Sequence, residues 1–569
     1  MHALLGLFSS VATGALGALG AAADFWDFKY FEKDSWSQLM KGLRIALTLG
    51  GALLLLYEVR AAKLGERIRE RTKKRVAVVL TILGFGVYFD FFNPNVRYSE
   101  YYHRHEFFHY YMGSKYAKEL GYTRIYECTA IAEIELGRLE DVQNRDLRDL
   151  HDSLIKPVKS SYVLTDPDQC KKRFTPEHWQ KFKDDVVWFE ANSRGDYWRE
   201  MQKDHGYNPP PVWTMTGQLL SRLAPAGDGF FKLLSALDVL LNLGMVLLLG
   251  WAFGWRVMTV GTVFWAVSAP NEFYWTGGAF LRQDWLFLLV AAVALARKRR
   301  FALAGAAATW SALLRVFPAI LFVGWVLAIA LELFQKRSLS SSNKRLIVGS
   351  LIAAAVLVPP SMLAAGADAY PAFAKNIVSR QAAGATNRMG LETMVQHDWD
   401  RRMRFLRDDN LSDPFEVWKR ERSARLDRLK PLYVLVIGFV FAWTLWALRR
   451  TKLLWAAVPL GLPLVVAVAD PACYYYSMFI VTALLIRQCP SLGPLMLATA
   501  GGSQILHVTY FWIDDRYAAE AWLFFIFGLM VLYAYSRPFS VARLRAWWHR
   551  EPETPPKRAA LSAHSEAAE

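Results

Sequence analysis

The sequence predicts an all-α polytopic membrane protein, a helical bundle with roughly 12–14 spans and two long loops outside the membrane. Hydrophobic residues make up 54% of the 569 residues. Many of them stand in uncharged runs of about 20 residues, the length that a helix needs to cross a bilayer. Lys and Arg collect in short segments between these runs. The buried helices of a soluble enzyme would not produce so many runs of this kind.

The apolar runs predict the spans. Residues 233–255 contain a single charged side chain, Asp238, and residues 346–366 and 432–448 contain none. The first residues, 1–24, are apolar and rich in small side chains, but they lack the basic start of a signal peptide. We therefore expect a weak first span or an interfacial helix there.

Charge predicts the topology, because short loops rich in Lys and Arg stay in the cytoplasm. The most basic loop, 60–75, follows the apolar segment 45–57. Further basic segments alternate with it along the chain: 297–300, 335–345, 449–452 and 537–569. This alternation requires residues 302–313 to form a short helix that stops at Arg315.

The same alternation divides the chain into domains. They are the N-terminal spans with the basic loop (1–92), a first extracytoplasmic loop (93–229), a central transmembrane bundle (230–366), a second extracytoplasmic loop (367–430), a C-terminal transmembrane bundle (431–536) and a disordered cytoplasmic tail (537–569). Long loops cross a membrane regardless of their charge, so the basic residues of the outer loops do not contradict this topology. The expected location is a cytoplasmic membrane.

The net charge of +16 comes from the basic loops and the tails. No basic stripe stands outside them, so we expect no nucleic-acid partner. Two of the four cysteines, Cys128 and Cys170, lie in the first outer loop, where an oxidising compartment permits a disulfide. A disulfide and two free thiols remain alternatives. No cysteine pair has the C-x-x-C spacing of a metal site.

The segment HRHEFFHYY, residues 103–111, contains His105, Glu106 and His109 in the spacing H-E-x-x-H. On a helix this spacing presents two imidazoles one turn apart with a carboxylate beside them, as in zinc hydrolases. Such a site needs a third ligand. The nearby candidates have no recognisable spacing: His103, Asp166 and Asp168. A zinc metalloprotease is therefore the alternative interpretation, and we expect no metal and no cofactor.

The longer segment 105–133 supports another interpretation. An acidic residue, Glu106, is followed by the aromatic pair Tyr110-Tyr111, and the segment ends on Gly121 and Tyr126. This order resembles the first outer-loop motif of the membrane glycosyltransferases of the GT-C superfamily, in particular glycosyltransferase family 87. Asp is commoner than Glu at the acidic position of that motif.

Further elements that resemble the family follow in order along the chain. GYNPPPVW (206–213) is similar to its Y-P-P element, with Asn208 intervening. GGAFLRQDWLFLL (277–289) and LAGAAATWSALLRVFPAILF (303–322) resemble its next two elements, with Arg315 in place of Lys and Pro318 in place of Pro. NRMGLE (387–392) lacks the family's Ser, and DPACYYYSMF (470–479) has tyrosines in place of Trp and His.

The resemblance implies a GT-C-like helical bundle with its active site at the outer face of the membrane. It implies transfer of a mannose-like hexose or a pentose from a polyprenyl-phosphate donor to a glycolipid, polysaccharide or protein acceptor, among membrane lipids. Glu106 would be the general base, and Arg315 and Arg388 would bind the donor phosphate. Other side chains would bind the sugar or the acceptor: His105, His109, Tyr110, Asp284, Asn387 and Tyr475.

Each of these residues also has a structural interpretation. An arginine at a helix end can extend to the membrane surface, and Glu106 can be a solvated loop acid. Tyrosines anchor helices at membrane interfaces, and the histidines can be ordinary surface side chains. A transporter is the non-enzymatic alternative, but it should show two matching halves with binding at mid-membrane. Here the charged and Pro-bearing elements cluster at the expected outer surface instead.

Overall fold

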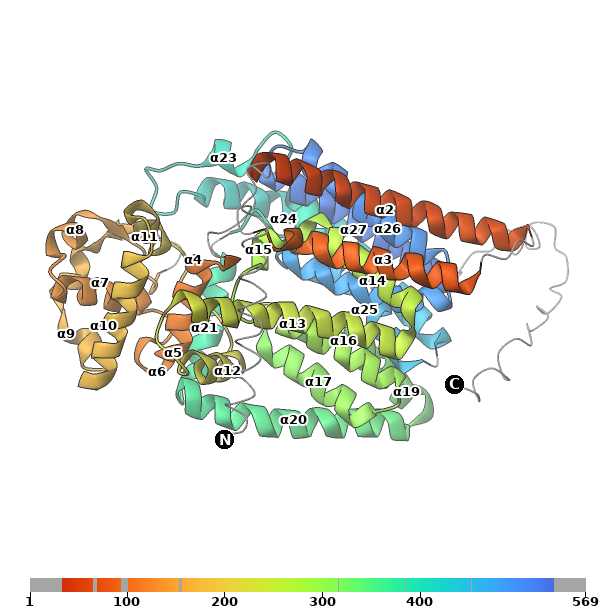
Figure 1. The fold of residues 1–569 in the computed structure, drawn as a ribbon, viewed down its shortest axis with the longest axis horizontal. Helices are drawn as coiled ribbons and strands as arrows, with labels where there is room; N and C mark the ends of the chain where they lie inside the picture. The colour runs from red at the N-terminus through yellow and green to blue at the C-terminus, as the bar shows by residue number, and fades with distance from the viewer. Residues whose placement is uncertain are drawn as a thin grey trace.

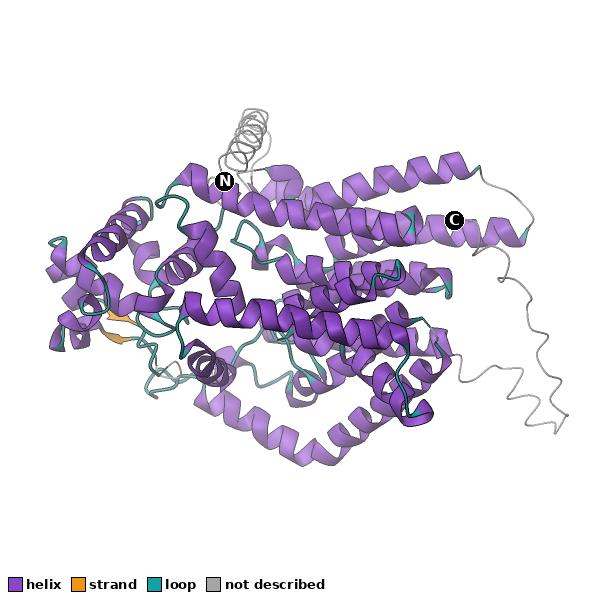
Figure 2. Ribbon diagram, turned by 90° about the horizontal axis from the view of Figure 1, so that it is seen from below, coloured by secondary structure: helices purple, strands orange, loops and turns teal. Residues whose placement is uncertain are grey.

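The chain is almost entirely helical. The computed structural model describes residues 33–64, 69–93, 101–152, 156–315, 317–382, 384–451 and 453–536. The strands within these ranges, β1 Asp146–Leu147 and β2 Val158–Lys159, form one short antiparallel pair. The expected all-α fold is thus confirmed at this level. Long helices run along the long axis of the molecule, and shorter helices gather at one end (Figure 1, Figure 2). The expected first span (1–24) and tail (537–569) lie outside the described residues.

Among the described helices, five are long and apolar enough to cross a membrane. The candidate spans are Trp36–Glu58 within α2 (Lys33–Lys63), α13 (Asp228–Phe253), α20 (Ser341–Ala365), α24 (Glu416–Arg450) and α27 (Ile513–Ser536). Large apolar side chains on these helices point outward, such as Leu363 and Leu435, which are 77% and 68% exposed. Exposed apolar surface of this extent is unfavourable in water and favourable in lipid. These are the features of a helical membrane protein.

The remaining expected spans stay a prediction, because the other apolar helices have 14 or 15 residues, fewer than the about 20 of a typical spanning helix. They are α17 (Phe301–Leu314), α25 (Leu454–Val468) and η6 (Cys473–Arg487). The expected short helix 302–313 is present as α17. The backbone becomes extended at Arg315, and Pro318 opens α18 (Pro318–Leu321) at its first position, where a missing N–H is harmless. Arg315 therefore lies at a break between two helices.

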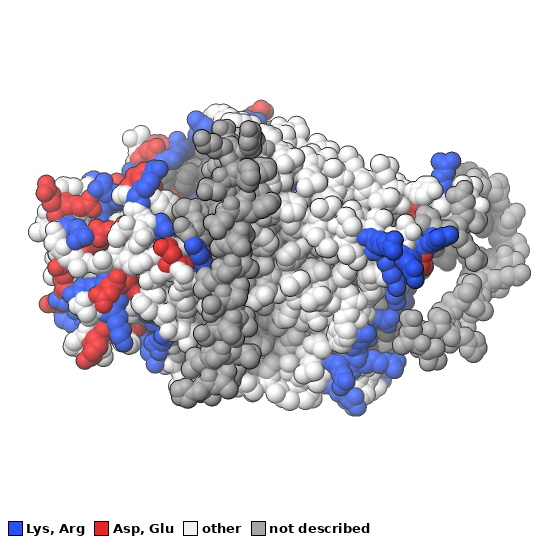
Figure 3. All heavy atoms as spheres, viewed as in Figure 1, with Lys and Arg blue, Asp and Glu red and all other residues white. Residues whose placement is uncertain are grey.

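The shorter helices at one end of the molecule form a group that we call the polar helices. Their bounds are α4 Arg104–Phe107, η3 Phe108–Met112, α5 Gly113–Lys115, α6 Ala117–Leu120, α7 Ile125–Glu135, α8 Leu139–Asn144, η4 Ser160–Thr165, α9 Asp168–Lys171, α10 Pro176–Ala191, α11 Gly195–Met201 and α12 Pro211–Ser221. A disulfide joins Cys128 on α7 to Cys170 on α9, with the two Cα atoms 5.4 Å apart. Charged side chains gather at this end and at the opposite end, and the face between them is nearly free of charge (Figure 3).

The rest of the bundle connects these parts. The remaining elements are α3 Glu70–Tyr88, η1 Asp90–Phe92, α14 Trp255–Val267, η5 Ala269–Asn271, α15 Phe273–Thr276, α16 Asp284–Arg297, α19 Val323–Lys336, α21 Ala369–Ala382, α22 Leu391–Gln396, α23 Met403–Leu406 and α26 Leu492–Thr509. Helix α16 packs against both α13 and α17.

Small residues allow α17 and α20 to pack closely. A side chain at Gly305 would overlap the carbonyl oxygen of Leu346, and a side chain at Gly349 would overlap the carbonyl oxygen of Ala302. Close approach of backbones at small residues is typical of membrane helices, because lipid provides no hydrophobic force that drives helices together. The position of α17, and with it Arg315, depends on this contact.

We predict that Gly349→Ala destabilises the protein, because the added methyl group must push α20 away from α17. Overpacking of this kind typically costs about 1–3 kcal/mol. The matched control is Gly438→Ala on α24, where the added methyl group meets no atom within 4 Å. Thermal unfolding of both variants in detergent or nanodiscs checks the prediction, and equal melting temperatures would contradict it.

Candidate active site

Glu106 lies on α4, at the junction between the polar helices and the long bundle (Figure 1). The backbone N–H of His103 donates to the carbonyl of Gly278 at 2.6 Å, which ties the start of α4 to the loop before α16. The Oε2 atom of Glu106 is buried and has no hydrogen-bond partner among the described residues. It lies 3.7 Å from Nε of Arg282. Glu106 is thus a carboxylate beside one cation, with lone pairs left to accept a proton.

Arg282 is positioned by a carboxylate inside a candidate span. Both oxygens of Asp238 on α13 accept the backbone N–H of Arg282, at 3.0 and 2.9 Å, and Oδ1 also accepts the N–H of Gln283 at 3.1 Å. The guanidinium of Arg282 donates to the hydroxyl of Tyr110 and lies 4.9 Å from the centre of its ring. Asp238 therefore fixes the backbone that presents Arg282 to Glu106 and Tyr110.

Arg315 is a second buried cation at the same tyrosine. It is 7% exposed, and its guanidinium lies 5.8 Å from the ring centre of Tyr110 and 5.4 Å from that of Trp213. One of its nitrogens donates to the carbonyl of Leu281 at 2.9 Å. No carboxylate among the described residues lies within ion-pair distance of it. A buried guanidinium that no carboxylate contacts directly keeps hydrogen-bond donors available to an incoming anion.

Tyr110 stands between the two arginines. It lies on η3, a π-helical turn that continues from α4, and such turns are frequent at functional sites. Its hydroxyl donates to Oδ1 of Asn208 at 2.8 Å and accepts from Arg282. The ring of Trp213 on α12 packs edge-on against it at 5.2 Å. Tyr110 thus connects two segments that are far apart in the sequence, 103–111 and 206–213.

Aromatic side chains from η6 cover the same cations. Arg282 lies 5.5 Å from the ring centre of Tyr474, whose ring is tilted by 43° against that of Tyr475 at a centroid distance of 4.8 Å. Tyr475 also contacts Trp285 on α16 at 5.2 Å. Asp284, the first residue of α16, is buried and interacts electrostatically with both arginines. Of the residues that the sequence singles out, Glu106, Tyr110, Asp284, Arg315 and Tyr475 are therefore gathered in one place.

Asn387 and Arg388 pair with another part of the chain. The carbonyl of Asn387 accepts the N–H of Cys473 at 2.8 Å, and the N–H of Met389 donates to the carbonyl of Pro471 at 2.9 Å. This antiparallel bridge joins the segments 387–392 and 470–479. The bridged segment continues into Tyr474 and Tyr475, so Asn387 and Arg388 lie near the two tyrosine rings that pack beside Arg282. Arg388, an expected phosphate-binding residue, thus lies in this bridge, whereas the arginines that contact Tyr110 are Arg282 and Arg315.

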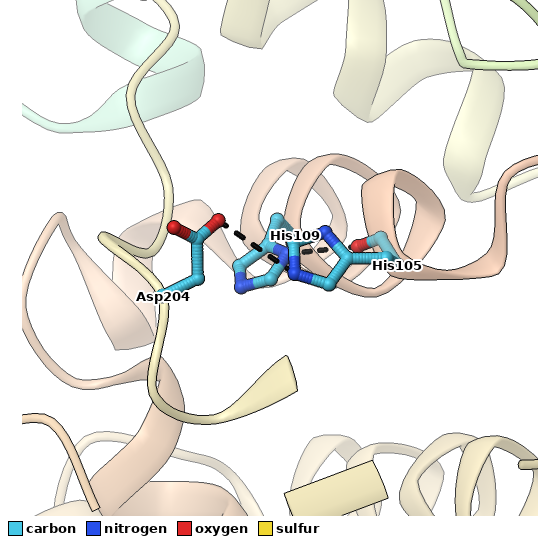
Figure 4. Close-up of side chains that lie close together, drawn as sticks. All are labelled: His105, His109 and Asp204. Atoms are coloured by element: carbon cyan, nitrogen blue, oxygen red, sulfur yellow. Dashed lines mark hydrogen bonds and ion pairs between the residues drawn. The ribbon is translucent and has the colours of Figure 1, made fainter. Parts of the chain in front are cut away.

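His105 and His109 form a cluster with Asp204 (Figure 4). Their candidate metal-binding atoms all lie within 4.8 Å of one another. Nε2 of His105 is 3.7 Å from Oδ2 of Asp204, which is too long for a hydrogen bond. These three residues could hold a metal ion between them, with Asp204 as the third ligand that sequence spacing does not reveal.

The hydrogen bonds of His109 oppose metal binding. Nδ1 lies 2.7 Å from the carbonyl oxygen of His105, so it carries a proton, and Nε2 therefore accepts the hydroxyl of Tyr126 at 2.6 Å. Burial lowers the pKa of His109 to about 4, helped by the neighbouring His105, so the ring is neutral at neutral pH. A metal ion could use Nε2 only by displacing the hydroxyl of Tyr126, which also accepts the N–H of Gly206 at 3.0 Å.

Some residues of the site were not among those that the sequence singles out: Arg282, Asp238, Asn208 and Trp213. Asp238 carried a usable signal, since a lone acid in an apolar run is a functional or structural site by default. Arg282 carried little signal, because it resembles any arginine at the end of an apolar run. No family model matches this chain, and no curated protein or solved structure matches it either.

Proposed function

We propose that the chain is an integral membrane glycosyltransferase that moves a sugar from a polyprenyl-phosphate donor to an acceptor hydroxyl at the outer face of the membrane. One observation carries the proposal. Glu106 lies beside Arg282, and Arg282 and the buried Arg315 both contact the side chain of Tyr110, while no carboxylate among the described residues forms an ion pair with Arg315. Transfer of a sugar from a phosphate requires a base for the acceptor hydroxyl and a cation for the phosphate. Glu106 would supply the first and the arginines the second.

The arginines would bind the donor phosphate. Arg315 donates one hydrogen bond to the carbonyl of Leu281, and its guanidinium has further N–H groups that could bind a phosphate. Arg282 lies on the same tyrosine, Tyr110. As the bond between the anomeric carbon and the phosphate oxygen breaks, the electron pair goes to that oxygen. Guanidinium groups fixed at that position stabilise the developing charge, and in a site that excludes water this effect is large.

Glu106 would accept the proton of the acceptor hydroxyl. Its Oε2 atom is buried and accepts no hydrogen bond from the described part of the chain. The acceptor oxygen forms a bond to the anomeric carbon while its proton passes to Glu106, and the phosphate leaves from the opposite side. A single displacement of this kind inverts the anomeric centre.

The aromatic side chains would hold the sugar. Tyr474 and Tyr475 present neighbouring rings beside Arg282, and Tyr110 and Asp284 offer polar groups next to them. The resemblance to GT-C enzymes favours a mannose-like hexose or a pentose as the sugar. It also favours a glycolipid, polysaccharide or protein as the acceptor, in a cytoplasmic membrane.

Glu106→Gln should abolish turnover, because the amide keeps the shape of the carboxylate and cannot accept a proton. A loss of about 10²–10⁴-fold is typical for a general base. The measurement is release of polyprenyl phosphate from a panel of polyprenyl-phosphate hexoses and pentoses by protein in nanodiscs with membrane glycolipids. The control is Glu140→Gln on α8, which lies on the surface. Wild-type turnover in Glu106→Gln would end the assignment.

Arg315→Gln should reduce kcat/KM for the same donor by about 10²–10³-fold, the usual effect of one charge-stabilising group. Arg315→Lys should restore part of this loss, because it restores the positive charge without the fork of guanidinium donors. Arg194→Gln provides the control, since that side chain is exposed and pairs with Asp196. If Arg315→Gln leaves both kcat and KM unchanged, Arg315 does not bind the donor.

A zinc hydrolase is the second candidate, and the cluster of His105, His109 and Asp204 is the observation that favours it. In that case purified protein should contain zinc that both His105→Ala and Asp204→Asn remove, and it should cleave peptides in a zinc-dependent reaction. Glycosyl transfer that persists in Asp204→Asn, with no peptide cleavage by the wild type, would reject this candidate.

A further inference from the structure

A second group of metal-binding side chains lies in the polar helices and shares no residue with the site around Glu106. Glu127 is on α7, and Asp149 and His151 follow β1. Nδ1 of His151 lies 3.3 Å from Oε1 of Glu127 and 3.1 Å from Oδ1 of Asp149. Ligand atoms about 2.0 Å from a tetrahedral zinc ion are separated by about 3.3 Å, so these distances suit a shared ion.

The carboxylate of Glu127 is unusually deeply buried for a charged group. The residue is 3% exposed, and its Oε2 atom is buried and has no hydrogen-bond partner within the described ranges. The hydroxyl of Tyr162, which interacts electrostatically with Glu127 and Asp149, is likewise buried without a partner there. Buried polar atoms are nearly always paired, so an atom left in this state points to a missing ligand.

The residues are held in place from both sides. The backbone N–H of His151 donates to Oδ1 of Asp149 at 2.8 Å, which fixes the turn between them. Arg148 ties the same segment to α11 through its backbone N–H to Gln202 and its side chain to the carbonyl of Lys203. On the other side, the disulfide at Cys128 anchors α7 next to Glu127. Such support lets ligands keep their geometry when an ion binds.

We infer that Glu127, Asp149 and His151 bind a divalent transition metal ion, with Zn²⁺ as the natural probe. The imidazole favours zinc over calcium, which takes oxygen ligands only. The hydrogen bond to Glu127 raises the pKa of His151, which favours the imidazolium in the absence of metal. The ion displaces the proton on Nδ1 to solvent, and the ring, which keeps its proton on Nε2, becomes neutral. The two carboxylates then carry the charge that a divalent ion neutralises, with Arg124 at longer range from Glu127, and the bound metal joins α7 to the 149–151 segment.

The experiment uses the full chain in nanodiscs, stripped of metal with a chelator and then dialysed against Zn²⁺. Bound zinc is measured by mass spectrometry, and its affinity by competition with a chromophoric chelator. Glu127→Gln and His151→Ala should each weaken zinc binding at least about 10-fold, as loss of a ligand group does. Zinc should also raise the melting temperature of the wild type and leave that of His151→Ala unchanged.

Two controls make the result specific. His178→Ala removes a histidine that faces a single carboxylate, Glu119, at 2.9 Å, and it should bind zinc as the wild type does. His105→Ala tests the other cluster and should also retain this zinc. If His151→Ala, whose side chain is half exposed and safe to replace, binds zinc with wild-type stoichiometry and affinity, the inference is wrong. The inference is equally wrong if folded wild-type protein binds no zinc, or if His105→Ala alone removes all of it.

Discussion

The carboxylate of Asp238 holds the loop on which the rest of the candidate active site depends. It accepts the backbone N–H groups of Arg282 and Gln283, while the preceding residue, Leu281, has a positive φ of 48°. A bulky residue keeps such a conformation only where its surroundings enforce it. The carbonyl of Leu281 then accepts from both Trp213, at 3.0 Å, and Arg315, at 2.9 Å. One loop thus joins α12, α13 and the end of α17, and it presents Arg282.

This arrangement explains why irregular backbone lies at the ends of apolar helices. Unpaired backbone groups are very unfavourable near lipid and are tolerated only where protein surrounds them. The side chain of Arg315, at the break, donates to the carbonyl of Leu281 in the loop 277–283, which pairs one backbone group of that loop. Such a site can keep its polar groups ordered before any ligand binds, which is the condition for electrostatic catalysis.

The sequence predicts the helical class, the short helix before Arg315 and several residues of the site, because these follow from runs of apolar residues and from local motifs. It does not predict Arg282 as their neighbour, since its direction depends on the conformation of Leu281 and on Asp238 across the bundle. Asp204 beside His105, and Cys128 beside Cys170, depend likewise on how distant helices pack. The number of spans is the least predictable feature, because several apolar segments form helices of 10–17 residues.

Three acids lie near the arginines, and their hydrogen bonds distinguish their roles. Asp238 uses both oxygens to accept backbone N–H groups, and Asp284 accepts the N–H of Trp285 at the start of α16. Both carboxylates are thereby engaged in holding backbone. Glu106 has a buried oxygen that accepts no hydrogen bond from the described residues, and its single cation is 3.7 Å away. A base must have lone pairs available to the proton that it removes. Glu106 meets that requirement, whereas both oxygens of Asp238 are already occupied by backbone N–H groups.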